Sequence, residues 1–163
     1  MPMNVRMPSM ADEGTCEIVI EHEGWQAVAG LEARCLEAVS AVLAMIEDPR
    51  PGPAVILFTG DGELQSLNQR FRGKDKPTNV LSFPAPESEQ YPGDIALAFE
   101  TCQAEANTRA IALVDHAAHL AVHGVLHLNG FDHKEEAEAE QMEAVEIAAL
   151  ARLGIANPYK ERI

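Results

Sequence analysis

Three histidines in the segment HGVLHLNGFDH, residues 123–133, place a strict condition on the fold, because they meet at one point only if a helix ends in a tight turn. His123 and His127 are four residues apart, so on a helix they lie one turn above each other with Cβ atoms about 6 Å apart. Gly130 can adopt the left-handed conformation that ends a helix and reverses the chain. His133 can then return to the same point. The segment predicts a helix, a turn and a shared metal ion.

Three neutral imidazoles are a ligand set typical of zinc. Structural zinc sites normally have four protein ligands, usually including cysteine, whereas three ligands leave a position for water, whose pKa the ion lowers to about 7. The pattern therefore favours one catalytic Zn²⁺, although Ni²⁺ or copper would also accept these imidazoles. The alternative is a set of surface or hydrogen-bonded histidines. Three of the six histidines fall in this one window, which argues against that alternative.

The spacing also matches the zinc-protease pattern H-E-x-x-H-x-x-G-x-x-H, except that Gly124 stands in place of the glutamate that serves as general base. Peptide hydrolysis by that route is therefore disfavoured. A zinc peptidase or amidase that takes its base from elsewhere in the chain stays open as an alternative.

Two further histidines precede the pair on the same helix face, within about 80° at 100° per residue, so not all four are ligands. His119 is expected either to support a ligand without touching the ion, to line the cleft, or to be a packing residue. For His116 packing is favoured. Asp132 is expected to cap the next helix, with orientation of an imidazole as the alternative. The acidic run EEAEAEQMEAVE, residues 135–146, is interpreted as a solvated helix face.

The hydrophobic pattern predicts an α/β (α+β) fold in which about four to five helices pack a mixed four-stranded sheet. Strands are expected at 15–23, 54–59, 79–83 and 94–99, and helices at 25–47, 61–73, 108–129 and 134–153. Two strand–helix–strand crossovers imply that the first three strands are parallel, and the loop before the fourth is compatible with an antiparallel return. A mostly parallel sheet with one antiparallel strand is therefore expected. The metal-bearing helix is expected to be central. Residues 1–15 are expected to be a flexible leader, and 16–163 a single domain.

The chain has 12 basic and 26 acidic residues, and its net charge of −14 opposes general attraction to nucleic acid or anionic lipid. A local exception is the segment that contains a third of all Lys and Arg residues: Arg70, Arg72, Lys74 and Lys76. This segment is the candidate binding site for a polyanionic substrate.

The cysteines and the hydropathy indicate the cellular compartment in which the protein is expected. Three cysteines without a C-x-x-C pair predict buried thiols in a reducing environment. No run of about 18 consecutive apolar residues occurs, so no membrane span is expected. These features predict a cytoplasmic protein without a membrane partner, and they leave the oligomeric state open.

Two blocks in this order, FRGKDKPTNVLSFP at residues 71–84 and HGVLHLNGFDH, resemble the YbeY family of metal-dependent endoribonucleases specific for single-stranded RNA. The resemblance extends from about Leu64 to the tail NPY at residues 157–159. It implies a role in ribosomal RNA maturation at the 3′ end of the small-subunit RNA and in ribosome quality control, with the ribosome or ribosome-associated proteins as partners. Asn79 stands where many members have aspartate, and Phe131 where many have tyrosine.

The resemblance also implies roles for individual residues. The histidines that match the metal ligands of the family are His123, His127 and His133. Arg72 matches an arginine that the family requires, and a guanidinium that stays charged suits phosphate. Without a glutamate at position 124, water at the ion must itself attack or accept a proton, while Arg72 stabilises the added charge on phosphorus.

The cations that flank Arg72 are expected to bind RNA phosphates without taking part in catalysis. They are Arg70, Lys74 and Lys76. The remaining alternative is a non-enzymatic ribosome assembly factor, in which the metal only stiffens the end of the helix and the basic loop docks on ribosomal RNA.

Overall fold

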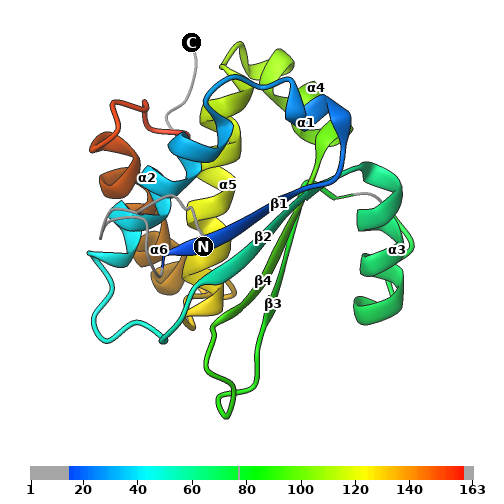
Figure 1. The fold of residues 1–163 in the computed structure, drawn as a ribbon. Coiled ribbons are helices and arrows are strands. Elements are labelled where there is room, and N and C mark those ends of the chain that lie inside the picture. Colours follow the sequence, from blue (N-terminus) through cyan, green and yellow to red (C-terminus); the bar gives the residue numbers. More distant parts are fainter. Residues whose placement is uncertain (1–14, 77, 160–163) are drawn as a thin grey trace, which may run out of the picture.

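The computed structural model describes residues 15–76 and 78–159, and the predicted leader, apart from Thr15, lies outside them. A four-stranded sheet runs through the middle of the molecule (Figure 1). Its strands, in the order β1-β2-β4-β3, are β1 (Cys16–Ile20), β2 (Ala54–Thr59), β4 (Gly93–Ala98) and β3 (Val80–Pro84). The mixed four-stranded sheet predicted from the sequence is therefore confirmed.

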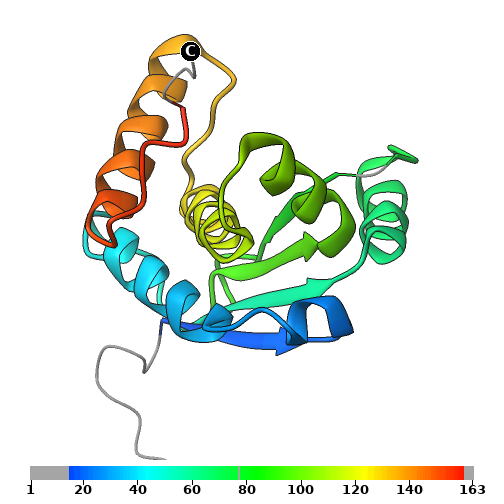
Figure 2. The ribbon, with the colours of Figure 1, turned by 90° about the horizontal axis from the view of Figure 1, so that it is seen from above.

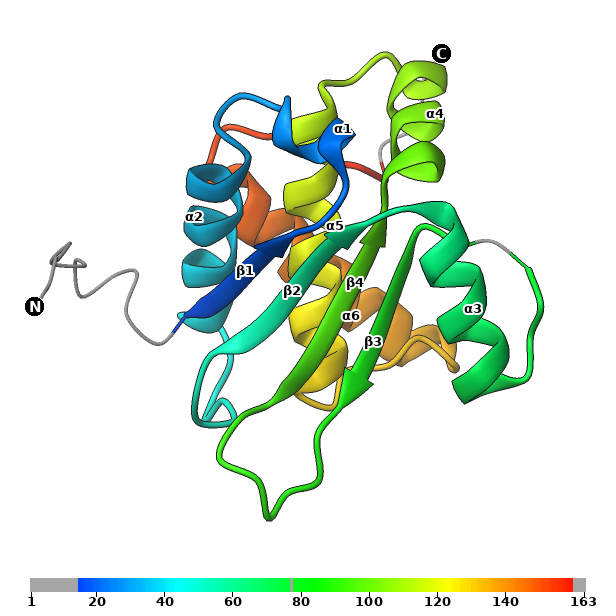
Figure 3. The same ribbon diagram turned by 45° about the vertical axis from the view of Figure 1, so that its right-hand side comes forward.

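The antiparallel strand is not the expected one. β1 pairs with β2 and β2 with β4 in parallel, whereas β3 pairs with β4 in the antiparallel direction. The prediction that the fourth strand would be antiparallel to the first three was wrong. After α3 (Asp61–Arg72) the chain returns beside that helix, so β3 starts at the end of the sheet where β2 finishes (Figure 3). The carbonyl of Asn79 accepts a hydrogen bond from the Ala98 amide at 3.0 Å, which fixes this return.

Six helices accompany the sheet in the described part of the chain, close to the four to five predicted. Besides α3 they are α1 (Glu23–Gln26), α2 (Leu31–Leu43), α4 (Phe99–Arg109), α5 (Leu113–Leu128) and α6 (Glu136–Ala151). The single helix predicted for 25–47 is wrong, because Gly30, with a φ of +74°, separates α1 from α2.

The predicted start of the metal-bearing helix near Thr108 is also wrong. α4 ends at Arg109, Ala110 turns the chain with a φ of +56°, and α5 starts at Leu113. α4 has no counterpart among the predicted helices, because its fully buried positions, Cys102 and Ala106, are small and give a weak hydrophobic pattern.

The sheet buries both faces. On one face, α5 lies between the sheet and α6, with α2 beside it (Figure 2), and these helices share the main core with alternate residues of β2 and β4. The strand residues in that core include Ile56, Phe58, Ile95 and Leu97. On the other face, α3 covers a smaller cluster of Leu64, Leu81, Ala96 and Ala98. The central position predicted for the metal-bearing helix is confirmed.

α5 approaches the sheet very closely at Gly124. A Cβ atom added at this glycine would lie 2.8–3.0 Å from three side-chain carbons of Ile95 on β4. Position 124 therefore faces the sheet, and the neighbouring His123 is left on a different side of the helix.

Within the described residues, no single helix is long and apolar enough to cross a membrane. α4 and α5 together meet the criterion by length and composition, but they meet at a bend of 115°.

Candidate metal centre and cleft

The three predicted ligands come together at the C-terminal end of α5. His123 and His127 lie on its last two turns, and Gly130, with a φ of +93°, reverses the chain so that His133 returns from the following loop. The nitrogen atoms that these three side chains can offer to an ion lie within 4.8 Å of one another. The helix and turn predicted from the histidine spacing are present.

Hydrogen bonds orient two of the rings. His123 Nδ1 lies 2.7 Å from Glu146 Oε2, and His127 Nδ1 lies 3.0 Å from the carbonyl oxygen of Phe131. A carbonyl only accepts, and an ionised carboxylate does too, so each Nδ1 carries the proton and each Nε2 has a lone pair. Burial, together with the neighbouring His123 and His133, lowers the pKa of His127 below its ordinary value of 6.5, which favours the neutral ring.

This arrangement fits a metal ion. The Nε2 atoms of His123 and His127 face each other at 3.1 Å. Two lone pairs that point at each other repel unless a cation lies between them. Two nitrogen ligands of tetrahedral zinc lie roughly 3.4 Å apart, given zinc–nitrogen distances of about 2.0–2.1 Å. The spacing of these two atoms is therefore close to that of a bound pair.

Glu146, which supports His123, was not identified from the sequence. It ends the acidic run at residues 135–146, for which the sequence predicts a solvated face, yet its side chain is fully buried. Burial alone would raise its pKa, but hydrogen bonds from His119, His123 and Tyr159 outweigh this and lower the pKa to about 2. Its position in the buried stripe of α6 was a usable signal, because Met142, Ala149 and Leu150 lie on the same helix face.

A cleft of about 620 Å³ opens beside the three histidines. One wall is the exposed edge of β3, with Val80, Ser82 and Pro84, and the other is the loop that runs from Gly130 to Lys134. Arg72, from the last turn of α3, also lines this cleft and is exposed. The structure therefore brings Arg72 and the histidines, which are about 50 residues apart in sequence, to one cleft.

The other predicted cations lie apart from this cleft. Arg70, Lys74 and Lys76 are exposed, and none belongs to the residues that line it. The guanidinium of Arg70 lies 5.5 Å from the centre of the Phe71 ring. Instead, Lys134 provides the second Lys or Arg side chain among the described lining residues. Lys134 directly follows the predicted ligand His133, and this adjacency could have identified it from the sequence. The clustering of Lys and Arg residues did not, because Lys134 lies outside the cluster at residues 70–76.

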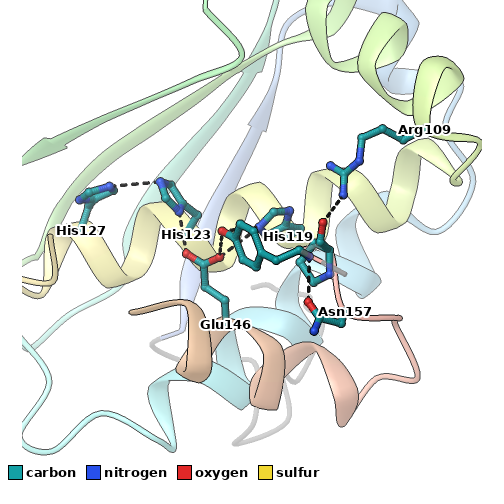
Figure 4. A network of polar contacts seen from close by, with 8 residues as sticks. Arg109, His119, His123, His127, Glu146 and Asn157 are labelled. Atoms are coloured by element: carbon teal, nitrogen blue, oxygen red, sulfur yellow. Dashed lines mark hydrogen bonds and ion pairs between the residues drawn. The ribbon is translucent and has the colours of Figure 1, made fainter. Parts of the chain in front are cut away.

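The remaining sequence-derived candidates have defined partners. His119 is buried, and its Nε2 lies 3.1 Å from Glu146 Oε1, so it reaches His123 through this carboxylate (Figure 4). His116 is buried and lies 2.8 Å from Glu105, in accord with packing. The helix cap predicted at Asp132 is wrong, since α6 is preceded by Glu135 and the Asp132 carboxylate accepts from the His133 amide at 2.7 Å.

Comparison with known proteins shows what this chain is similar to. The family model described as endoribonuclease YbeY matches residues 22–154. An endoribonuclease YbeY of Maricaulis maris is 50% identical over 144 residues, which cover 88% of this chain and 90% of the relative. An endoribonuclease YbeY of Erythrobacter litoralis is 48% identical over 161 residues, which cover 90% of this chain and 98% of the relative.

A solved structure shares the fold. The solution structure of TM1509 from Thermotoga maritima matches with a TM-score of 0.54 and 24% sequence identity. The match covers 90% of this chain and 99% of that protein.

Proposed function

The chain belongs to the endoribonuclease YbeY family, and from this premise we propose that it is a metal-dependent endoribonuclease that cleaves single-stranded RNA. The observation that carries the proposal is the pair of facing Nε2 atoms of His123 and His127 at 3.1 Å, beside a cleft that also contains Arg72. The proposed ligands are His123, His127 and His133, and the proposed ion is Zn²⁺.

Contacts within the chain keep two of the three rings that would hold the ion in a fixed orientation. Glu146 and the Phe131 carbonyl keep the Nδ1 protons in place, so the Nε2 atoms of His123 and His127 stay available as ligands. When bound, a divalent ion lowers the pKa of a water molecule and polarises a phosphate oxygen.

Arg72 is the proposed catalytic cation. Its guanidinium keeps its charge throughout the reaction and presents paired donors that match two phosphate oxygens. It would stabilise the charge that accumulates on the phosphate as the new bond to phosphorus forms. Lys134 lines the same cleft and is proposed to bind that phosphate or the next one. Arg70, Lys74 and Lys76, outside the cleft, are proposed to hold phosphates further along the strand.

The geometry at position 124 argues against peptide hydrolysis by the zinc-protease route. A side chain there would meet Ile95 rather than a substrate, so this helix face has no room for the glutamate that zinc proteases use as a base.

We further propose that the substrate is ribosomal RNA at the 3′ end of the small subunit, processed in the cytoplasm with the ribosome as partner. The net charge of −14 supports delivery by a partner, because it weakens long-range attraction between the isolated protein and bare RNA.

The test uses purified protein loaded with Zn²⁺ and a single-stranded RNA, with the same sequence in a duplex as control. We expect cleavage of the single strand only, loss of cleavage with a chelator, and recovery when Zn²⁺ is restored. Products with a 2′,3′-cyclic phosphate indicate attack by the 2′-hydroxyl, and a 5′-phosphate indicates attack by water.

Two results would refute the proposal. Chelator-sensitive turnover of casein without RNA cleavage would identify a peptidase. Full cellular function of a folded His123→Ala variant would identify a non-enzymatic assembly factor.

A further inference from the structure

Glu146 is a buried carboxylate at the centre of a polar network that starts at the metal centre and ends at the exposed Tyr159, in the C-terminal segment 152–159 that follows α6 (Figure 4). One carboxylate oxygen, Oε2, lies 2.7 Å from His123 Nδ1. The other, Oε1, lies 3.1 Å from His119 Nε2 and accepts a hydrogen bond from the hydroxyl of Tyr159. The two oxygens of this one buried carboxylate therefore have separate partners.

Burial of this carboxylate lowers the stability of the fold unless its partners offset the loss of hydration. A fully buried carboxylate loses its hydration, and only hydrogen bonds and charge partners offset that loss. The stripe of α6 that contains Glu146 is otherwise apolar, with Met142, Ala149 and Leu150. An apolar residue at position 146 would fill the same space without the desolvation penalty, so the carboxylate is explained best by what it does to His123.

The C-terminal segment brings the Tyr159 hydroxyl to this carboxylate through several polar contacts. The Ile155 amide donates to the Leu150 carbonyl at 3.0 Å, and the Tyr159 amide donates to Asn157 Oδ1 at 2.8 Å. The guanidinium of Arg109, on α4, donates to the Pro158 carbonyl at 2.6 Å. The ring of Tyr159 also packs edge-on against that of His119, with centroids 5.5 Å apart.

We propose that Glu146 is a positioning residue that fixes the ring and the tautomer of His123 for metal binding, and that Tyr159 holds Glu146 in this role. The inference rests on the metal centre of the proposed function. Because Tyr159 and His119 occupy Oε1, the carboxylate cannot rotate away from His123 without losing both partners. The C-terminal segment is then a structural part of the metal centre.

The change Glu146→Gln keeps the size of the side chain but leaves one acceptor oxygen, which serves either His123 or the Tyr159 hydroxyl. We expect Zn²⁺ affinity to fall about 10- to 100-fold, the effect usual for loss of a partner that orients a metal ligand. The change Tyr159→Phe keeps the ring and removes only the hydroxyl. It should weaken Zn²⁺ binding in the same direction by a smaller factor.

A matched control is available for each variant. Glu140→Gln removes an exposed carboxylate of α6, and Tyr91→Phe removes the hydroxyl of the chain's other tyrosine, which donates to Asp94 at the end of the β3–β4 hairpin. Both should bind Zn²⁺ as the unmodified protein does. Thermal unfolding of the metal-free variants checks that each is folded.

The measurements are the Zn²⁺ dissociation constant, by competition with a chromophoric chelator, and the tautomer of His123, by two-bond ¹H–¹⁵N correlation of the metal-free protein. The unmodified protein should show the proton of His123 on Nδ1, and Glu146→Gln should show a mixture of tautomers. A role limited to packing would leave that tautomer unchanged.

The outcomes separate the two proposals. If Glu146→Gln and Tyr159→Phe both bind Zn²⁺ within about twofold of the unmodified protein, the inference is wrong while the proposed function stands. If only Tyr159→Phe does so, the role of the C-terminal segment is wrong. If the unmodified protein binds no Zn²⁺, the proposed function fails, and the inference fails with it.

Discussion

Arg72 is the exposed side chain to which the proposed function assigns phosphate stabilisation. It lies in the last turn of α3, lines the cleft beside the histidines, and is not needed to fill the core. A residue in such a position is expected to affect the reaction far more than the stability of the fold.

We therefore expect Arg72→Ala to lower the rate of RNA cleavage about 10²- to 10³-fold, the usual cost of removing one donor that stabilises developing charge. Zn²⁺ affinity and the unfolding temperature should stay unchanged. Single-turnover cleavage kinetics measure the rate, and Arg152→Ala, which removes an exposed arginine outside the cleft, is the matched control. Unchanged cleavage by Arg72→Ala would remove this residue from the mechanism.

His116 makes the stability of the fold depend on pH. Burial lowers the pKa of His116 below its ordinary value of 6.5, although the contact with Glu105 acts in the opposite direction. The unfolded chain therefore takes up the proton more readily than the folded chain, and the free energy of unfolding falls as the pH drops below about 6.5.

This effect is testable with His116→Gln, whose amide can still donate to Glu105. When the pH is lowered below about 6.5, the free energy of unfolding of the metal-free unmodified protein should fall more than that of the variant, because the variant lacks this titrating group. Denaturant unfolding measures both free energies. His127 contributes in the same direction, since burial lowers its pKa too, and the variant retains that part of the slope. Equal pH slopes for the two proteins would contradict the assignment.

At the scale of helices and strands, the contact between α5 and β4 decides where the histidines lie. Replacing a helical glycine by alanine normally favours the helix by up to about 1 kcal/mol. At Gly124 the added methyl would lie 2.8–3.0 Å from Ile95, and such overpacking costs about 1–3 kcal/mol. The steric cost should therefore prevail over the helix propensity.

Gly124→Ala is accordingly expected to lower the free energy of unfolding by on the order of 1 kcal/mol or more, measured by denaturant unfolding. Gly62→Ala in α3 is the control, because nothing lies within 4 Å of the added atom, and it should be neutral or slightly stabilising. Adding Ile95→Val to Gly124→Ala removes one of the three clashing carbons and should recover part of the loss. A stabilised Gly124→Ala would show that the helix has room at this position.

The elements also show which parts of the fold the sequence predicts. β2 is a continuous apolar run and α5 has strong helical spacing, so both could be predicted from local pattern alone. The direction of β3 could not, because it depends on where the chain goes after α3, and no periodicity in that segment determines this. α4 was missed because its buried residues are small.

The same distinction applies to the site. The three histidines lie within eleven residues, so local spacing was enough to predict that they meet. Glu146 is 23 residues from His123 and reaches it only because α6 packs against α5. The charge pattern does not distinguish Glu146, because the run contains six glutamates and nothing in that pattern indicates which of them is buried.

At the scale of the whole molecule, the charges oppose the proposed substrate. The net charge is −14, whereas the positive side chains proposed to contact phosphates are few and lie around one cleft and the neighbouring segment. Binding to RNA therefore depends on short-range contacts, which salt weakens, while the long-range field of the protein repels a polyanion.

We expect the isolated protein to bind a single-stranded RNA weakly, with an affinity that falls as salt rises. On a single strand, each phosphate neutralised contributes about −0.7 to the slope of log affinity against log salt. The slope should therefore be no steeper than about −3.5 for the five proposed contacts, which come from Arg70, Arg72, Lys74, Lys76 and Lys134. Lys134→Ala should reduce the slope by about 0.7 if this side chain contacts a phosphate. Fluorescence anisotropy between about 50 and 200 mM salt measures it. A tight complex that is insensitive to salt would mean that stacking or base contacts dominate, and would remove the electrostatic reason for delivery of the substrate by the ribosome.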